Sequence, residues 1–257
     1  MMTIAPPIEV IPWLGFREPF NSFSHLIGAV VFAALAFRLI RLGRGDWVRT
    51  TSLIVLAIAS VAMLLVSGIY HLHWPGPTRD LLLRMDVAVV FVLIAASMTP
   101  VHAILFEGPA RWGPLVLIWA VAISGVAWRI SLKESSPGTL GVVVFLLFGW
   151  SSVIISAVLL HRFGWSFMQP AILSGLAYTI GAICLMFHRP TIVPGLIGPH
   201  ELWHVAVLCG IGLQWYFVSQ FASPLTIPVR IRPPKFRDQI ATLTDPVGYS
   251  DLPAKTD

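Results

Sequence analysis

Long apolar stretches alternate with short polar connections over most of the chain. Crossing a hydrocarbon layer about 30 Å thick takes about 20 mostly apolar residues in a helix. Seven stretches meet this condition: residues 22–40, 51–72, 82–102, 112–132, 139–160, 167–187 and 200–220. The connections carry typical turn residues, such as Gly43, Gly45 and Pro137-Gly138. The pattern predicts an all-α, polytopic membrane protein built as a bundle of seven transmembrane helices.

Composition agrees with this interpretation, because 56% of the 257 residues are apolar and only 11% are charged. We expect residues 1–21 to form a short N-terminal segment without the basic and apolar regions of a signal peptide. Residues 22–222 form the predicted transmembrane domain, and residues 223–257, rich in proline and polar residues, a disordered tail. The net charge of +5 suits anionic lipid headgroups, and we infer no nucleic-acid partner from it.

Polar residues gather at the span ends that seven crossings place on one membrane face. Ser67 and His71 end the second stretch, Asp86 lies near the start of the third, and His200 and His204 open the seventh. Residues four apart lie on one face of a helix, so His200 and His204 can bind a common atom. Ionisable groups within membrane spans are costly, and their default interpretation is functional.

Three of these residues predict a metal site. His71, His200 and His204 offer three nitrogen ligands and leave one position open, which is the arrangement of catalytic zinc. We therefore expect Zn²⁺ as cofactor, and bound zinc lowers the pKa of its water to about 7, which supplies a hydroxide at neutral pH. We expect three further histidines to be ordinary polar residues at helix ends: His25, His73 and His188.

Asp86 and Ser67 are the predicted catalytic residues beside the zinc. Asp86 would orient the water or accept its proton, and Ser67 would hold that water or the developing oxyanion. The alternative for Asp86 is an ion pair with Arg79 or Arg84, which are close to it in sequence.

Several ordered segments carry a family resemblance. They are NSFSHLIG (21–28), SGIYH (67–71), RMD (84–86), IAASMTP (94–100), GW (149–150), GLAYTIG (175–181) and HELWH (200–204). With these segments, which extend over nearly all seven stretches, the chain resembles the hemolysin III branch of the progestin and adipoQ receptor family. Eukaryotic members of that family include the adiponectin receptors.

The resemblance implies a seven-helix membrane protein in which zinc is held by His71, His200 and His204, with Asp86 and Ser67 beside it. The wider superfamily includes alkaline ceramidases, so the resemblance also implies hydrolysis of a lipid amide. Two positions depart from the bacterial pattern, which usually has histidine in both: Val87 and Gln214. A proton relay through those positions is therefore in doubt, whereas the zinc ligands are unaffected.

Two alternatives to a lipid hydrolase stay open. The segment from His200 to His204 also has the His-Glu-x-x-His pattern of zinc proteases, in which the glutamate is the general base. No glutamate follows Glu201 to serve as the third ligand, so we expect Glu201 to be incidental. The second alternative is a protein without enzymatic activity in which zinc is structural: a receptor, a protein that supports membrane lipid homeostasis, or a pore-forming, cytolytic protein. The leading hypothesis is zinc-dependent hydrolysis of an amide or ester in a membrane lipid.

Membrane lipids are the expected partners, and we expect the protein in the bacterial cytoplasmic membrane. Positively charged loops tend to stay cytoplasmic, and more Lys and Arg residues lie on the side opposite the histidines. That distribution would place the histidines outside, whereas the receptor relatives have the opposite orientation, which we follow. The oligomeric state is open, because Gly175 and Gly181 permit close helix contacts either within one chain or between two.

Overall fold

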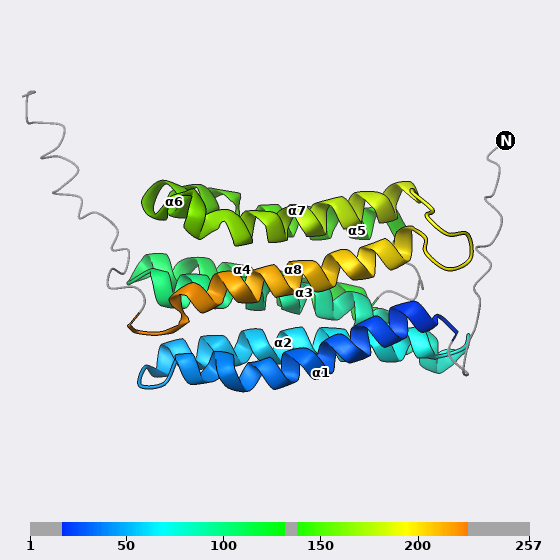
Figure 1. Ribbon diagram of the computed structural model, residues 1–257, viewed down its shortest axis with the longest axis horizontal. Helices are drawn as coiled ribbons and strands as arrows, with labels where there is room; N and C mark the ends of the chain where they lie inside the picture. Colours follow the sequence, from blue (N-terminus) through cyan, green and yellow to red (C-terminus); the bar gives the residue numbers. More distant parts are fainter. Residues whose placement is uncertain (1–16, 132–137, 226–257) are drawn as a thin grey trace, which may run out of the picture.

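The computed structural model describes residues 17–131 and 138–225, which form eight α-helices running side by side along the long axis of the molecule (Figure 1). The helices are α1 (Pro19–Leu42), α2 (Trp47–Leu72), α3 (Pro77–Leu105), α4 (Pro109–Ser131), α5 (Gly138–Trp150), α6 (Val153–Phe163), α7 (Trp165–Phe187) and α8 (Pro199–Ala222). They provide seven candidate membrane spans, because α5 and α6 together form the fifth, Leu140–Phe163. The predicted seven-helix bundle is confirmed, and the chain is a multi-pass integral membrane protein.

Most of the helices begin earlier than predicted, and four of them start at a proline: Pro19, Pro77, Pro109 and Pro199. Proline is favoured at the first helical position, because its fixed φ suits a helix and the N–H that it lacks would have no partner there. Some predicted segments lie outside the described residues: 1–16 of the N-terminal segment, 132 of the fourth stretch and 226–257 of the tail.

The fifth span is divided, although one unbroken helix was predicted over residues 139–160. The hydroxyl of Ser151 donates to the carbonyl of Phe148 at 2.6 Å, and that of Ser152 donates to Gly149 at 2.8 Å. Serine hydroxyls that bond to preceding carbonyls compete with the helical ladder and bend helices. The prediction of one unbroken helix was wrong, because Ser151 and Ser152 separate α5 from α6, while the span itself was predicted correctly.

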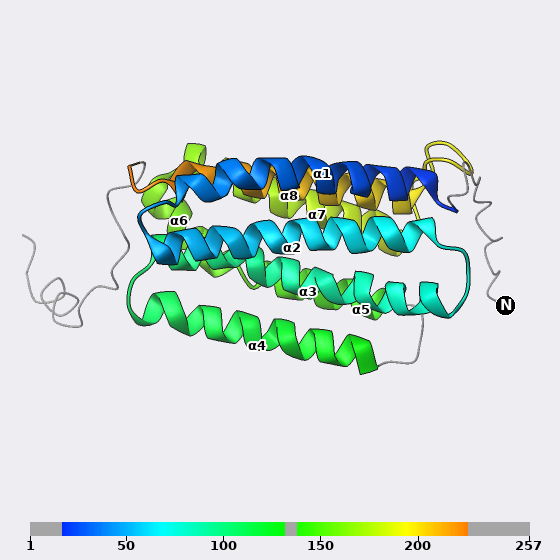
Figure 2. The same cartoon turned by 90° about the horizontal axis from the view of Figure 1, so that it is seen from below.

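The spans differ in how deeply they are buried. Over the most apolar 18 residues of each span, 56% of the residues in α2 and 50% of those in α8 are buried, whereas only 11% are buried in the fifth span. α2 packs against α1 and α3, and α8 packs against α7 and α1. Figure 2 shows α4 at the outer edge of the bundle, beside α3. The two most buried spans are therefore α2 and α8, which also carry the predicted metal ligands.

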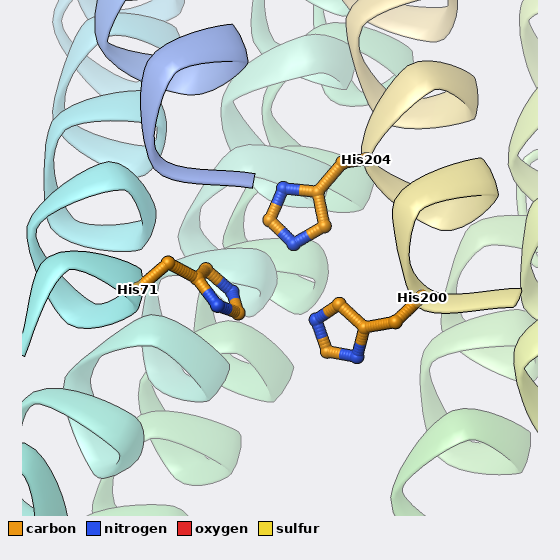
Figure 3. A group of neighbouring side chains, drawn as sticks. All are labelled: His71, His200 and His204. Atoms are coloured by element: carbon orange, nitrogen blue, oxygen red, sulfur yellow. The ribbon is translucent and has the colours of Figure 1, made fainter. Parts of the chain in front are cut away.

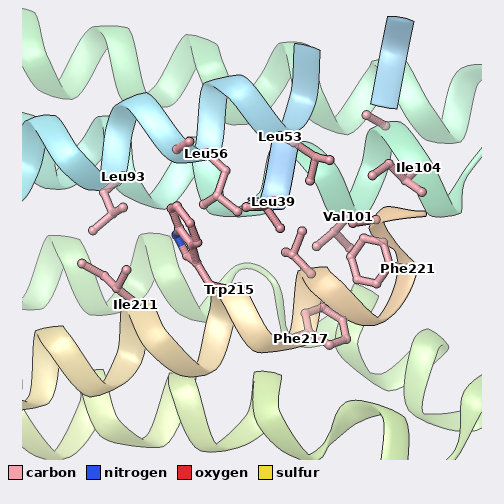
Figure 4. Close-up of a cluster of buried hydrophobic side chains, with 14 of the residues drawn as sticks. Leu39, Leu53, Leu56, Leu93, Val101, Ile104, Ile211, Trp215, Phe217 and Phe221 are labelled. Carbon is pink, nitrogen blue, oxygen red and sulfur yellow. The ribbon is translucent and has the colours of Figure 1, made fainter. Parts of the chain in front are cut away.

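An apolar core fills the bundle beyond those ligands (Figure 4). On α8, Ile211, Trp215 and Val218 continue the helix face that begins with His204, and all three are buried. The indole N–H of Trp215 donates to the Ser60 hydroxyl at 3.0 Å, which satisfies its one polar atom. One stripe of α8 thus changes from polar at its first turn to apolar along the rest of the helix.

Close contact at Gly68 fixes α1 against α2. The Ser22 hydroxyl donates to the Gly68 carbonyl at 2.8 Å. A Cβ atom at position 68 would lie 2.7 Å from Leu26 Cγ and 3.2 Å from the Leu26 backbone nitrogen. The absence of a side chain at Gly68 therefore lets the two helices approach. At Gly181 an added Cβ would lie 2.5 Å from Ala206, so this glycine serves packing of α7 on α8.

Substituting Gly68→Val is expected to lower the free energy of unfolding by about 1–3 kcal/mol, the usual cost of overpacking. The cause is the backbone of α1, which cannot retreat without losing the Ser22 hydrogen bond. Titration of the purified protein with a denaturing detergent measures the change. Gly175→Val is the matched control, because an added Cβ there meets nothing within 4 Å. Equal stability of the two variants would contradict the prediction.

Candidate metal centre

Three histidines from two helices meet at one end of the bundle (Figure 3). His71 lies in the last turn of α2, and His200 and His204 lie in the first two turns of α8. Their candidate ligand nitrogens all lie within 4.8 Å of one another. His71 and His204 are buried, and His200 is partly buried. The structure thus brings together the three residues that the sequence pattern singled out.

Hydrogen bonds occupy one ring nitrogen on two of these histidines. Nδ1 of His71 lies 2.5 Å from Oε2 of Glu18, and Nδ1 of His204 lies 2.9 Å from Nε2 of His25. In each ring this leaves Nε2 as the nitrogen able to bind a metal. A partner on the second nitrogen is the usual arrangement around metal-bound histidine, since it sets the tautomer and the ring orientation.

The donor set fits a divalent transition metal. Tetrahedral zinc with bonds of about 2.0–2.1 Å requires ligand nitrogens about 3.4 Å apart. The candidate ligand nitrogens lie within 4.8 Å of one another, so small rotations of the imidazole rings would bring them to that distance. Imidazole suits Zn, Cu, Fe and Ni alike, so the three histidines define a site that could hold a metal ion without determining which one.

Glu18 is the carboxylate at the centre of this network. One of its oxygens bonds to His71, and the other accepts from Nη2 of Arg79 at 2.7 Å. Burial alone would raise the pKa of Glu18. The hydrogen bond with His71 and the electrostatic interactions with His71, His200 and Arg79 instead lower this pKa well below its usual range. Glu18 is therefore ionised and acts as a hydrogen-bond acceptor.

Ser67 and Asp86 lie next to the histidines and are joined by a side-chain hydrogen bond. Asp86 lies close enough to His71 for an electrostatic interaction. Arg79, the partner considered for Asp86 from sequence, pairs with Glu18 and also donates to the carbonyls of Tyr70 and His73. Among the described residues, no ion pair joins Asp86 to Arg79 or Arg84.

Glu201 caps the start of α8. One carboxylate oxygen accepts from the backbone N–H of Gly198 at 2.9 Å, which caps α8. The other accepts from the amide of Asn21 at 3.0 Å. Both oxygens of Glu201 are therefore engaged. This arrangement does not suit the general base of a zinc protease.

Sequence reasoning missed two residues of the centre. Glu18 was treated as part of an N-terminal segment, and His25 was expected to be an ordinary polar residue at a helix end. His25 is instead 1% exposed and packs its ring 4.0 Å from that of His204. The available signal was their spacing, because Glu18, Asn21 and His25 share one face once the helix begins at Pro19.

Comparison with known proteins shows which family the chain resembles along most of its length. The haemolysin-III related family matches residues 15–215, a range that contains all residues of the centre. The chain belongs to this family. It is 24% identical to Hemolysin-3 of Bacillus cereus over 211 aligned residues. The aligned region covers 81% of this chain and 93% of that protein. The chain is 25% identical over 204 residues to the Hemolysin-3 homolog of Bacillus subtilis (strain 168), with 79% and 92% covered.

Gln214 and Val87, the two positions where the sequence departs from the bacterial haemolysin III pattern, are not among the three candidate ligands. Gln214 is ten residues beyond His204, about 15 Å along the helix. Its amide donates to the Ser97 carbonyl at 3.0 Å and so joins α8 to α3. Val87 is a buried apolar residue. Neither takes part in the hydrogen bonds around the three histidines.

Proposed function

We propose that this haemolysin III family protein is a zinc-dependent hydrolase that cleaves an amide or ester bond in a membrane lipid. The observation that carries the proposal is the convergence of His71, His200 and His204 beside the hydrogen-bonded pair of Ser67 and Asp86. Three nitrogen ligands with an open position are typical of catalytic zinc, and a carboxylate nearby provides a base.

The depth of the site supports a lipid substrate. The ligands lie in the last turn of α2 and the first turns of α8, close to the ends of two membrane spans. The amide and ester linkages of lipids lie between headgroup and acyl chain, near the ends of a transmembrane helix. Apolar side chains exposed at this end of α3, Leu81 and Met85, suit contact with acyl chains.

Zinc bound to the histidines would lower the pKa of water to about 7 and polarise the substrate carbonyl. Asp86 accepts the proton of the attacking water as the oxygen adds to the carbonyl carbon. When the C–N or C–O bond breaks, Asp86 returns that proton to the leaving nitrogen or oxygen. Ser67, which hydrogen-bonds to Asp86, fixes the carboxylate and accepts a hydrogen bond from the water.

The proposal is tested by measuring fatty-acid release from purified, zinc-loaded protein in lipid vesicles. The vesicles contain either a ceramide or an ester phospholipid, so that the bond cleaved is identified. Release that is lost after chelation, and restored by added zinc, is the expected result. Stoichiometric zinc without release from either lipid would overturn the proposal.

A structural metal is the second candidate. His71 belongs to α2, whereas His200 and His204 belong to α8, so an ion would cross-link the two most buried spans. The Bacillus relatives are named hemolysins, and lysis of vesicles is the corresponding activity. Chelation that lowers the unfolding temperature, with vesicle leakage and no lipid hydrolysis, would favour this candidate.

A further inference from the structure

We propose that the start of α1 is the positioning element of the metal centre, through Glu18, Asn21 and His25. The inference rests on metal binding by the three histidines, as in the proposed function. Glu18 precedes Pro19, the first residue of α1, and the three residues are spaced i, i+3 and i+7. This spacing places them on one side of the helix, where each contacts a different part of the centre.

Glu18 holds His71 through both side chain and main chain. Its carboxylate bonds to Nδ1 of His71, and its backbone N–H donates to the His71 carbonyl at 3.2 Å. Arg79 fixes the carboxylate from the other side, and its guanidinium lies 4.3 Å from the centre of the Tyr70 ring. The acceptor is therefore locked before any ligand binds, so the His71 ring is held with Nε2 directed away from Glu18.

His25 performs the corresponding function for His204. For Nε2 of His204 to bind a metal it must be unprotonated, so the proton of this ring is on Nδ1. That N–H donates to Nε2 of His25, which lies 2.9 Å away. His25 must then carry its own proton on Nδ1, a buried atom with no partner among the described residues. Metal binding thus selects one tautomer in each of two histidines whose rings are in contact.

Asn21 joins the two sides of the centre. Its amide nitrogen donates to Glu201 at 3.0 Å and lies 3.4 Å from Oε2 of Glu18. Glu201 is next to His200 and caps α8, so Asn21 ties the start of α8 to the carboxylate that orients His71. Asn21 is 1% exposed, which excludes solvent as a competing partner. α1 therefore holds α2 and α8 at a fixed spacing, although it supplies none of the three histidine ligands.

The test compares zinc affinity in full-length protein in detergent, using competition with a chromophoric chelator. Glu18→Ala and His25→Leu remove the acceptors, and each is expected to weaken zinc binding about 10–100-fold, the usual effect of a residue that orients a metal ligand. Glu18→Gln and His25→Gln keep an oxygen acceptor and are expected to recover most of the affinity. The absorption spectrum of bound Co²⁺ is expected to change in Glu18→Ala and His25→Leu. In the two glutamine variants it is expected to stay near that of the wild-type protein.

Matched controls are available at the other end of the bundle. Asp46→Ala removes a carboxylate that caps α2, and His102→Gln replaces a buried histidine of α3. Both are expected to bind zinc as wild type does. His25→Leu leaves the Arg79 contacts intact, so it provides the test if Glu18→Ala does not fold.

Unchanged zinc affinity and Co²⁺ spectra in folded Glu18→Ala and His25→Leu would overturn the positioning role. Zinc bound by wild type and lost in His71→Ala would then still support the metal site, so this failure is distinct from failure of the proposed function. Absence of zinc binding by the wild-type protein would overturn both.

Discussion

Replacing His204 by alanine is expected to abolish stoichiometric zinc binding. The residue supplies one of three ligand nitrogens, and its loss also removes the hydrogen bond with His25. Changes in residues that only orient ligands cost about 10–100-fold in affinity, so loss of a ligand is expected to cost at least about 100-fold. Elemental analysis after equilibrium dialysis measures zinc per chain, with about one expected in the wild-type protein.

His71→Ala is expected to give the same loss, because α2 and α8 share one site. His102→Ala is the control, since this histidine is also buried but lies at the opposite end of α3 near the Ala110 carbonyl. Zinc that persists in His71→Ala, or that disappears equally in His102→Ala, would contradict a site made by these three histidines.

Replacing Asp86 by asparagine is expected to lower turnover of the lipid substrate about 10²–10⁴-fold, the usual contribution of a general base. An amide cannot accept the proton of water at neutral pH. It still accepts the hydrogen bond from Ser67 and keeps the shape of the side chain, so zinc content is expected to stay near that of wild type. Measuring kcat and zinc on the same preparation separates loss of the base from loss of metal.

Asp80→Asn is the matched control for Asp86→Asn, because Asp80 is an exposed aspartate in the first turn of the same helix. Its turnover is expected to equal that of wild type. An Asp86→Asn protein that retains full turnover would show that this carboxylate is not the base, even if zinc-dependent hydrolysis occurs.

The membrane spans could be predicted from the sequence because the requirement that they meet is local. Each helix must place about 20 mostly apolar residues across the hydrocarbon, and this is visible in a single stretch. The division of the fifth span was missed, since hydroxyls such as Ser151 and Ser152 can face outward or bond to the preceding turn without any change in hydropathy.

The grouping of the histidine ligands was also predictable, for two reasons. His200 and His204 share a helix face by their spacing, and an odd number of spans places the end of α2 and the start of α8 on one membrane face. The same reasoning placed Ser67 one turn before His71. The roles of Ser67 and Asp86 in catalysis stay predictions that the experiments above address.

The sequence by itself thus determined the spans and the three-histidine group, while the tertiary structure decided what surrounds them. Glu18 meets His71 across 53 positions, and His25 meets His204 across 179. Such contacts depend on how each helix is rotated about its axis and how closely it packs, as at Gly68. Hydropathy constrains neither quantity tightly, because in a membrane both faces of a span can be apolar. The positions of these partners are therefore set by packing between helices.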